Sequence, residues 1–206
     1  MAFEFRHDVS QGDLFGDAPA LPAGMRYAPD LISAAEESAL VDALRDLPFH
    51  EFQFHGFVGR RRTVSYGSSY DFNGGGLREA GELPSFLEPV RERAAAFAAL
   101  DPSALQHALV IEYAPGAGIG WHRDRPAFDD VIGISLKSAC TFRLRRKVGE
   151  RWERRSLTAE PRSAYLLRGP SRTEWEHSIP PLTTLRYSIT FRSMAADRTR
   201  RGPAAD

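Results

Sequence analysis

The stretch Gly116-Ala-Gly-Ile-Gly-Trp-His-Arg-Asp124 decides how this sequence is interpreted. Its last residues place His122 and Asp124 at alternate positions, so on an extended segment both side chains leave the same face and can bind one ion together. A third ligand is then needed, and His177 in Trp175-Glu-His-Ser-Ile is the best candidate. The glycine-rich approach supports the interpretation, because glycine allows close backbone turns. The sequence therefore predicts a metal site.

The chemistry of these ligands narrows the choice of metal. Two imidazoles and one carboxylate on one side of an octahedral ion form the facial triad of non-haem Fe(II) oxygenases. That arrangement leaves coordination positions open for a substrate and O2. A His-x-Asp pair occurs often by chance, so the prediction also depends on the residues after His177.

Two arginines after His177 predict an anionic partner inside the fold. Arg186 and Arg192 lie an even number of positions apart in Arg-Tyr-Ser-Ile-Thr-Phe-Arg. In a strand their side chains share one face with Ser188 and Thr190. A polar face turned into a barrel needs a buried anion, and a dicarboxylate satisfies it because arginine binds carboxylates in bidentate fashion and stays charged when desolvated.

Composition bounds the possible classes of protein. The 206 residues suit one domain with a substantial core. Lysine plus arginine and aspartate plus glutamate are equal at 27 each, so any polyanion must meet a local patch. The single cysteine, Cys140, permits no internal disulfide, and neither a signal peptide nor a membrane span is expected. We expect a cytoplasmic monomer.

Local patterns divide the chain into three parts. Residues 1–24 are predicted to be a flexible arm, 25–194 a single domain, and 195–206 a disordered tail. Ser33-Ala-Ala-Glu36 and Ser85-Phe-Leu-Glu88 both have the form of a capping box before a helical stripe. Two helices are therefore expected before the His122 motif.

From His107 onward the pattern changes to short β-type runs separated by turn residues. With no helical spacers between them, these runs favour an antiparallel barrel or jelly roll. The expected fold is therefore mainly β with flanking α-helices. The predicted strands cover residues 108–113, 131–136, 140–144, 163–167 and 185–191.

Two segments are candidates for contacting a substrate. Residues 49–76 could form a lid, in which Phe54 and Phe57 precede the basic triplet Arg60, Arg61 and Arg62. Core packing is the commoner fate of such aromatics, and a basic triplet is more often a solvated face. The highly charged segment 143–155 is predicted to be a surface hairpin, and its alternative role is a patch that meets phosphates.

The ordered combination of motifs resembles the AlkB family of Fe(II)/2-oxoglutarate-dependent dioxygenases. The resemblance covers most of the chain and implies a double-stranded β-helix core with two N-terminal helices. The motifs that carry it are Tyr66-Gly67 with Tyr70, the helix entered at Pro84, Glu112-Tyr113-x-x-Gly116, His122-x-Asp124, Phe128 with Ile132-x-Ile-Ser-Leu136, Pro161-Arg-Ser163, Trp175-x-His177, and Arg186 to Arg192.

The resemblance also implies roles for single residues. His122, Asp124 and His177 would bind Fe(II), and Arg186 would pair with the distal carboxylate of 2-oxoglutarate. Arg192 would lie near the carboxylate that chelates iron. Other co-substrate contacts would come from Tyr113 and Ser188, and a flipped base would stack on Phe54, Phe57, Tyr66 or Trp175.

Some positions depart from the family pattern. Ile111 and Ser188 stand where well-studied members carry asparagine, which changes the details of the co-substrate contacts. After Asp124, members that repair methylated bases often carry an acid, whereas this chain has Arg125 and Pro126. The second departure bears on the substrate.

Three functions remain as alternatives. The first is oxidative demethylation of alkylated DNA or RNA, in which O2 and 2-oxoglutarate are consumed and formaldehyde is released, as in DNA repair. The second is hydroxylation or demethylation of protein side chains or a small molecule, which the neutral net charge and Pro126 favour. The third, a barrel that only binds a partner, is disfavoured because a buried polar set is costly to keep without a ligand.

Overall fold

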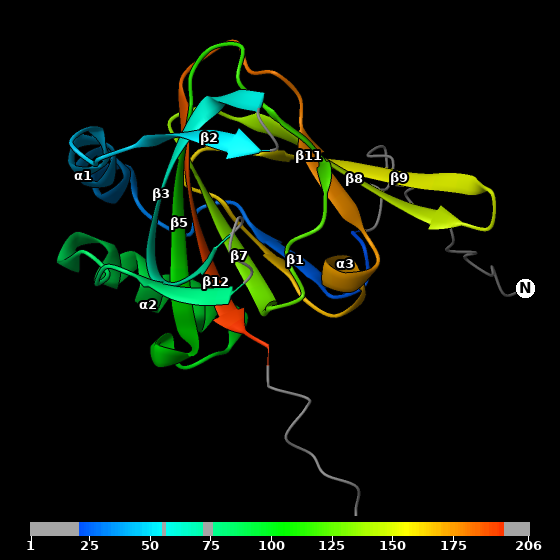
Figure 1. Cartoon of the computed structure of the whole chain (residues 1–206), viewed down its shortest axis with the longest axis horizontal. Helices are drawn as coiled ribbons and strands as arrows, with labels where there is room; N and C mark the ends of the chain where they lie inside the picture. The colour runs from blue at the N-terminus through cyan, green and yellow to red at the C-terminus, as the bar shows by residue number, and fades with distance from the viewer. Residues whose placement is uncertain (1–20, 55–56, 72–75, 196–206) are drawn as a thin grey trace, which may run out of the picture.

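The computed structural model describes residues 21–54, 57–71 and 76–195. For those of them that fall within 52–60 and 68–80, only the backbone is described. Within these ranges the chain forms two β-sheets whose paired strands are all antiparallel (Figure 1). The larger sheet has eight described strands, in the order β1 (Met25–Ala28), β10 (Ala164–Leu167), β7 (Phe128–Leu136), β12 (Arg186–Met194), β5 (Leu105–Tyr113), β3 (Phe57–Asp71) and β2 (His50–Phe54), with β4 (Gly76–Ala80) pairing β3.

The smaller sheet has four described strands and faces the larger one. Its order is β6 (Ile119–His122), β11 (Glu176–Ile179), β8 (Cys140–Val148) and β9 (Arg151–Ala159). One buried cluster takes side chains from both sheets, among them Tyr113, Tyr165, Phe142 and Leu144. The prediction of a jelly-roll core is thereby confirmed.

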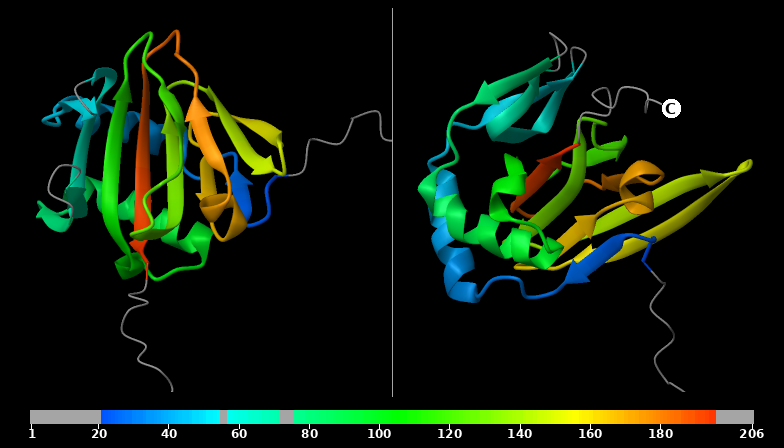
Figure 2. Two further views of the ribbon diagram at one scale, coloured as in Figure 1. Left: turned by 45° about the vertical axis from the view of Figure 1, so that its right-hand side comes forward. Right: turned by 90° about the horizontal axis from the view of Figure 1, so that it is seen from below.

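The helices cover the other face of the larger sheet. Helices α1 (Ala34–Arg45) and α2 (Glu88–Ala98) lie together on one side of it in both Figure 1 and Figure 2. A second buried cluster joins Leu44 and Val90 of these helices to Ile134 and Ile189 of the sheet. Short helical turns complete the described chain at η1 (Ser85–Leu87), η2 (Pro102–Ala104) and α3 (Pro170–Thr173). None of the described helices is both long and apolar enough to span a membrane.

One of the two predicted capping boxes forms. Ser33 accepts a hydrogen bond from the Glu36 amide at 3.2 Å, and the Glu36 carboxylate accepts one from the Ser33 amide at 2.8 Å. The prediction at Ser85 is wrong: residues 85–87 form a 3-10 turn, and α2 starts at Glu88 with no side-chain cap. Pro89 in the first turn explains this, since its fixed φ suits a helix start and its missing amide needs no cap.

Four of the five predicted strands are longer than the apolar runs that predicted them, and β10 is one residue shorter. Strand β8 continues to Val148 and pairs with β9, which confirms the predicted hairpin at 143–155. Residues 61–67 of the predicted lid pair with β5 and so belong to the larger sheet. The boundaries of the arm and the tail stay predictions, because residues 1–20 and 196–206 lie outside the described part of the chain.

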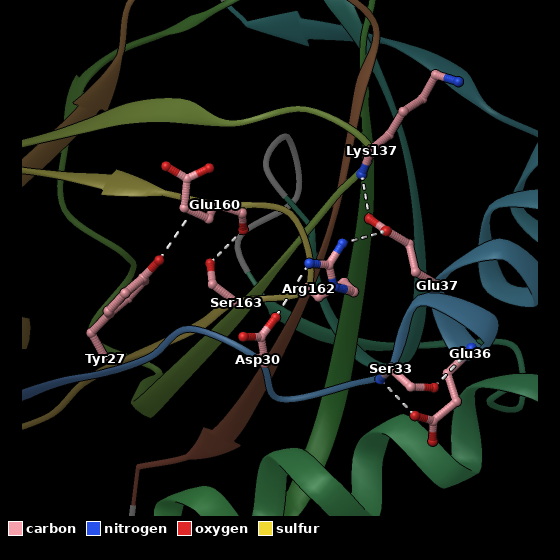
Figure 3. Close-up of polar contacts among 9 residues, drawn as sticks. All are labelled: Tyr27, Asp30, Ser33, Glu36, Glu37, Lys137, Glu160, Arg162 and Ser163. Atoms are coloured by element: carbon pink, nitrogen blue, oxygen red, sulfur yellow. Dashed lines mark hydrogen bonds and ion pairs between the residues drawn. The ribbon is translucent and has the colours of Figure 1, made fainter.

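Glu37 ties α1 to two turns of the sheet. Its carboxylate accepts a hydrogen bond from the Lys137 amide at 2.8 Å and lies 3.5 Å from Nη1 of Arg162 (Figure 3). Arg162 also reaches Asp30 at 3.3 Å. Both Lys137 and Arg162 have positive φ angles, 72° and 67°, which cost a side-chain-bearing residue about 1 kcal/mol or more. The helix thus stabilises two strained turns at once.

The glycines before His122 are not equivalent. Gly116 has a positive φ of 83°. A Cβ added at Gly118 would lie 2.7 Å from the carbonyl oxygen of Ile179, whereas a Cβ at Gly120 would meet nothing within 4 Å. Two of the three glycines are therefore required by the backbone, and Gly120 is not.

We expect Gly118→Ala to lower the free energy of unfolding by about 1–3 kcal/mol, because the backbone of residues 179–181 must move to admit the methyl group. Gly120→Ala, on the same segment, should stay within about 0.5 kcal/mol of the parent. Urea denaturation of both variants measures the difference. Equal stability of the two would contradict the close packing at Gly118.

Candidate metal and co-substrate site

The three predicted metal ligands come together between the sheets. His122 at the end of β6 and His177 at the start of β11 are cross-strand partners, with ring centroids 4.2 Å apart. Asp124 lies two residues beyond the end of β6, and its Oδ2 lies 3.6 Å from Nε2 of His177. Residues far apart in the chain are thus neighbours because β6 and β11 pair.

Both histidines are held in the state that binds metals. Burial lowers the pKa of His177 to about 3 and also lowers the pKa of His122. At neutral pH both rings are therefore uncharged and keep a lone pair for a metal. Nδ1 of His122 lies 2.9 Å from the Gly120 carbonyl oxygen, which as a hydrogen bond leaves Nε2 for the ion.

Asp124 supplies the negative charge of the site. Burial alone would raise its pKa, but the Arg192 guanidinium and the neighbouring histidines hold the pKa well below its usual range. Arg192 donates to Oδ1 through Nε at 2.9 Å, and its Nη2 lies 2.8 Å from the same oxygen as an ion pair. The carboxylate stays ionised, with Oδ2 turned toward His177.

The three predicted ligands lie close together, but their side chains do not converge on one metal position. In the part of the chain that the structure describes, no group of three His, Cys, Asp or Glu side chains satisfies the geometry of a complete metal site. The carboxylate of Asp124 is shared with Arg192, which draws one of its oxygens toward β12. The assignment of His122, Asp124 and His177 as ligands stays a prediction, supported by their proximity, neutral rings and buried carboxylate.

Arg186 is the strongest indication of a bound anion. Its side chain is 1 % exposed, yet among the described residues it forms no ion pair with an acid. Nε donates to Ser135 Oγ at 3.1 Å, while Nη1 is buried without a hydrogen-bond partner. An orphaned charged donor in the interior is costly, so the site fits a carboxylate that is not part of the protein.

Tyr113 and Ser188 lie beside Arg186. The guanidinium carbon of Arg186 lies 5.1 Å from the centre of the Tyr113 ring, and Tyr113 is its partner across β5 and β12. Burial raises the pKa of Tyr113, and the nearby Arg186 and Ser188 partly oppose that shift. The predicted co-substrate residues Tyr113, Arg186 and Ser188 therefore lie together, whereas Arg192 lies with Asp124 at the metal end.

Sequence reasoning missed two supporting residues. His107, on β5 opposite Arg192, places Nδ1 3.3 Å from Nη1 of that arginine and rests on Phe128 with ring centroids 4.9 Å apart. Burial lowers its pKa to about 3, so the neutral ring can accept a hydrogen bond from Arg192. Ser135 is the second, through its contact with Arg186. Alternation along β5 could have identified His107, which shares a face with Tyr113.

Arg172 holds the loop that follows Asp124. This buried side chain donates to the carbonyl oxygens of Arg125 and, at 2.8 Å, Phe128. It comes from the short helix α3, which lies just before β11. The loop that carries Asp124 is therefore fixed to the segment that carries His177.

The residues predicted to contact a substrate are dispersed. Arg61 faces inward, and its Nη1 lies 3.5 Å from the Gly118 carbonyl oxygen, while Arg62 faces outward and makes a bidentate pair with Glu112 at 2.8 and 2.9 Å. The idea of one phosphate-binding triplet is wrong, because neighbouring residues of a strand point to opposite faces. The side chain of Arg60 lies outside the described part.

The predicted base-stacking aromatics also separate. Tyr66 packs against the helix-side core, on the face of the sheet away from Arg186, and Trp175 is buried in the core between the sheets. Tyr66 therefore faces away from the predicted site, which contradicts its assignment, whereas the role of Trp175 stays a prediction. Phe54 and Phe57 are cross-strand partners in the β2–β3 hairpin, but their side chains lie outside the described residues.

Comparisons with known proteins agree with this geometry. The model of a family described as the 2OG-Fe(II) oxygenase superfamily matches residues 24–192. An "Alkylated DNA repair protein ALKBH8 homolog" of Arabidopsis thaliana is 30% identical over 181 residues, which is 76% of this chain and 51% of that protein. A "Probable RNA/DNA demethylase ALKBH6" of Danio rerio is 32% identical over 112 residues, 54% of this chain and 45% of that protein.

A solved structure, that of OsALKBH1, is similar in fold. Its TM-score is 0.62 at 16% identity, and the match covers 84% of this chain and 100% of that one. At that identity the likeness shows the fold alone. The chain spans about half the length of the curated relatives it matches.

We expect Arg186→Ala to weaken binding of 2-oxoglutarate by a factor of hundreds or more, because losing one partner of a buried ion pair costs roughly 3–5 kcal/mol. Arg186→Lys should restore part of the affinity, since lysine keeps the charge but lacks the planar fork. Calorimetric titration of the metal-loaded proteins measures both. Arg45→Ala, an exposed change on α1, is the control, and unchanged affinity in Arg186→Ala would contradict the assignment.

Proposed function

The chain belongs to the 2OG-Fe(II) oxygenase superfamily as an AlkB-like member, and from that premise we propose that it oxidatively demethylates alkylated bases in DNA or RNA. Members of this superfamily use Fe(II), 2-oxoglutarate and O2. The observation that carries the catalytic class is Arg186, a buried cation with an unpaired donor in the same interior as His122, Asp124 and His177.

Different residues would bind the co-substrate and the iron. At one end Arg186 and Tyr113 would hold the far carboxylate of 2-oxoglutarate, and Ser135 keeps the guanidinium in place. At the other end His122, Asp124 and His177 would hold Fe(II). When bound, the iron and 2-oxoglutarate supply the oxidising power that inserts one oxygen atom of O2 into a substrate C–H bond.

Arg192 and His107 position the predicted metal ligand Asp124 and keep it charged. Arg192 keeps Asp124 ionised and in place, and the neutral His107 ring accepts from Arg192 without adding charge. Burial excludes water from this end, which strengthens the electrostatic interactions there. The protein thus places an anionic ligand beside two neutral ones.

The nucleic-acid substrate is proposed from the printed names of two relatives, one an alkylated DNA repair protein homolog and the other a probable RNA/DNA demethylase. An N-methyl group fits the chemistry, since its hydroxylated product loses formaldehyde and leaves the bare nitrogen. Repair of alkylated DNA is one setting for that reaction. Pro126, where an acid would read a methylated base, instead favours hydroxylation of a protein side chain or small molecule.

Replacing His177 with alanine should abolish Fe(II)-dependent conversion of 2-oxoglutarate to succinate, because the ring is one of three expected ligands. The fold should survive, since the apolar core between the sheets is built from other side chains. Succinate release and thermal unfolding are measured together. A folded His177→Ala protein that converts 2-oxoglutarate at the parental rate would show that His177 is not a ligand.

We further expect a strand carrying 1-methyladenine or 3-methylcytosine to stimulate succinate formation and to release formaldehyde. The same strand without methyl groups is the control, because it offers equal charge but no target carbon. If no methylated strand stimulates turnover at low salt, the nucleic-acid assignment fails. The protein or small-molecule alternative would then be preferred.

A further inference from the structure

The outer face of the smaller sheet carries an aromatic and basic cluster that the proposed catalytic site does not use. Strand alternation turns His122 and His177 inward and places Trp121 and Arg145 on the opposite side. The Arg145 guanidinium lies between two indoles, 4.4 Å from the Trp121 ring centre and 4.2 Å from that of Trp152. The result is a row of flat groups on an outer surface.

The charge on this face is predominantly positive. Arg145 is paired with Glu176 at 2.7 Å, so that charge is largely compensated. Within the described chain, Arg143, Lys147 and Arg154 form no ion pair with an acid. Arg143 instead donates to Ser178 at 3.0 Å and lies 5.1 Å from the Trp121 ring centre, and Nη1 of Arg154 lies 3.5 Å from the Trp152 carbonyl oxygen. Three cations are thus available to an anionic partner.

An open hollow lies beside this cluster. It has a volume of about 540 Å³, and its lining combines the cations Arg123, Arg146 and Lys147 with Val148, Trp152, Thr173 and two acids, Glu174 and Glu176. Both acids are already paired, Glu174 with Arg146 and Glu176 with Arg145. Arg123 lies between the predicted ligands His122 and Asp124 in the sequence. The hollow is therefore next in the chain to the predicted ligands, where the strand on either side of a bound nucleotide would pass.

The β8–β9 hairpin, which lines part of the hollow, exposes apolar surface. It projects beyond the rest of the two sheets in Figure 1 and in the right-hand view of Figure 2. Among the described residues, three large hydrophobic side chains are exposed, and two of them, Val148 and Trp152, lie on this hairpin. Exposed indole beside unpaired cations is the combination that binds single-stranded nucleic acid, in which bases stack and phosphates meet basic groups.

We infer that the hollow and the outer face of β8 and β9 bind the single strand that flanks the target nucleotide, with a base on Trp152 and phosphates near Lys147 and Arg154. This inference rests on the proposed function for its substrate class. An acidic peptide would use the cations but has no base to stack on the indole, so nucleic acid suits the surface better.

The test is the binding of a labelled, unmethylated single-stranded oligonucleotide, followed by fluorescence anisotropy at several salt concentrations. Using an unmethylated strand separates this surface from recognition of a target base. Trp152→Ala should weaken binding by about five- to a hundredfold, the range typical for loss of one base–aromatic stack. Arg154→Glu should weaken binding and flatten the salt dependence by about 0.7 or more in logarithmic slope.

A matched control is Arg45→Glu, which makes the same charge change at an exposed arginine on α1. It should bind the oligonucleotide as the parent does. Thermal unfolding of each variant shows that the fold is kept. A labelled polyglutamate peptide should bind weakly and with no dependence on Trp152.

Three results would overturn the inference. The first is equal oligonucleotide binding by Trp152→Ala, Arg154→Glu and Arg45→Glu. The second is that the parent does not bind the oligonucleotide at low salt. The third is that polyglutamate binds as tightly as the oligonucleotide and depends equally on Trp152. If the variants lose binding but no methylated strand is demethylated, the result supports the binding surface and contradicts the proposed demethylase function. Demethylation with unaltered binding by the variants would overturn the surface alone.

Discussion

Two buried guanidinium groups on one strand impose the constraint on which the interior of this protein depends. Arg186 and Arg192 are both removed from water on β12, and each needs negative charge nearby. Arg192 finds it in Asp124, at 2.8 Å. Arg186 finds no acid in the described chain, and one of its donors is orphaned. The charge of Arg192 is therefore balanced by the protein itself, whereas the charge of Arg186 would be balanced by a bound carboxylate ligand.

The same burial sets the protonation of the metal end. Desolvation lowers the pKa of His177 to about 3 and also lowers the pKa of His122, so both imidazoles are neutral at physiological pH. Asp124 remains the negative group among them because Arg192 offsets its desolvation. A cation placed here meets one anion and two neutral donors, which is the donor set of a facial triad.

Strand alternation gives the smaller sheet two different faces. Strands β6 and β11 turn His122 and His177 into the sandwich, while Trp121 and Glu176 point outward. The inner face is enclosed and carries the predicted metal ligands, and the outer face is exposed, aromatic and basic. The same alternation separates Arg61 from Arg62 on β3, so a basic run in the sequence is not a basic patch in the fold.

The sequence by itself determined which side chains share a face within one segment. The spacing of His122 and Asp124, the common face of Arg186, Ser188 and Arg192, and the capping box at Ser33 depend only on the local period of a strand or helix. The hairpin at 143–155 was likewise predictable, because its strands are adjacent in the chain. These local rules, with the family resemblance, gave the jelly-roll fold and most of the candidate site.

Tertiary structure alone decided which segments meet. Ser135 supports Arg186, and His107 supports Arg192, because β12 pairs with β7 on one side and β5 on the other. Tyr66 and Trp175 are core residues, and Arg62 is paired with Glu112, for the same kind of reason. The physical cause is that the register between strands distant in sequence is set by packing of the whole sandwich, which no local pattern specifies.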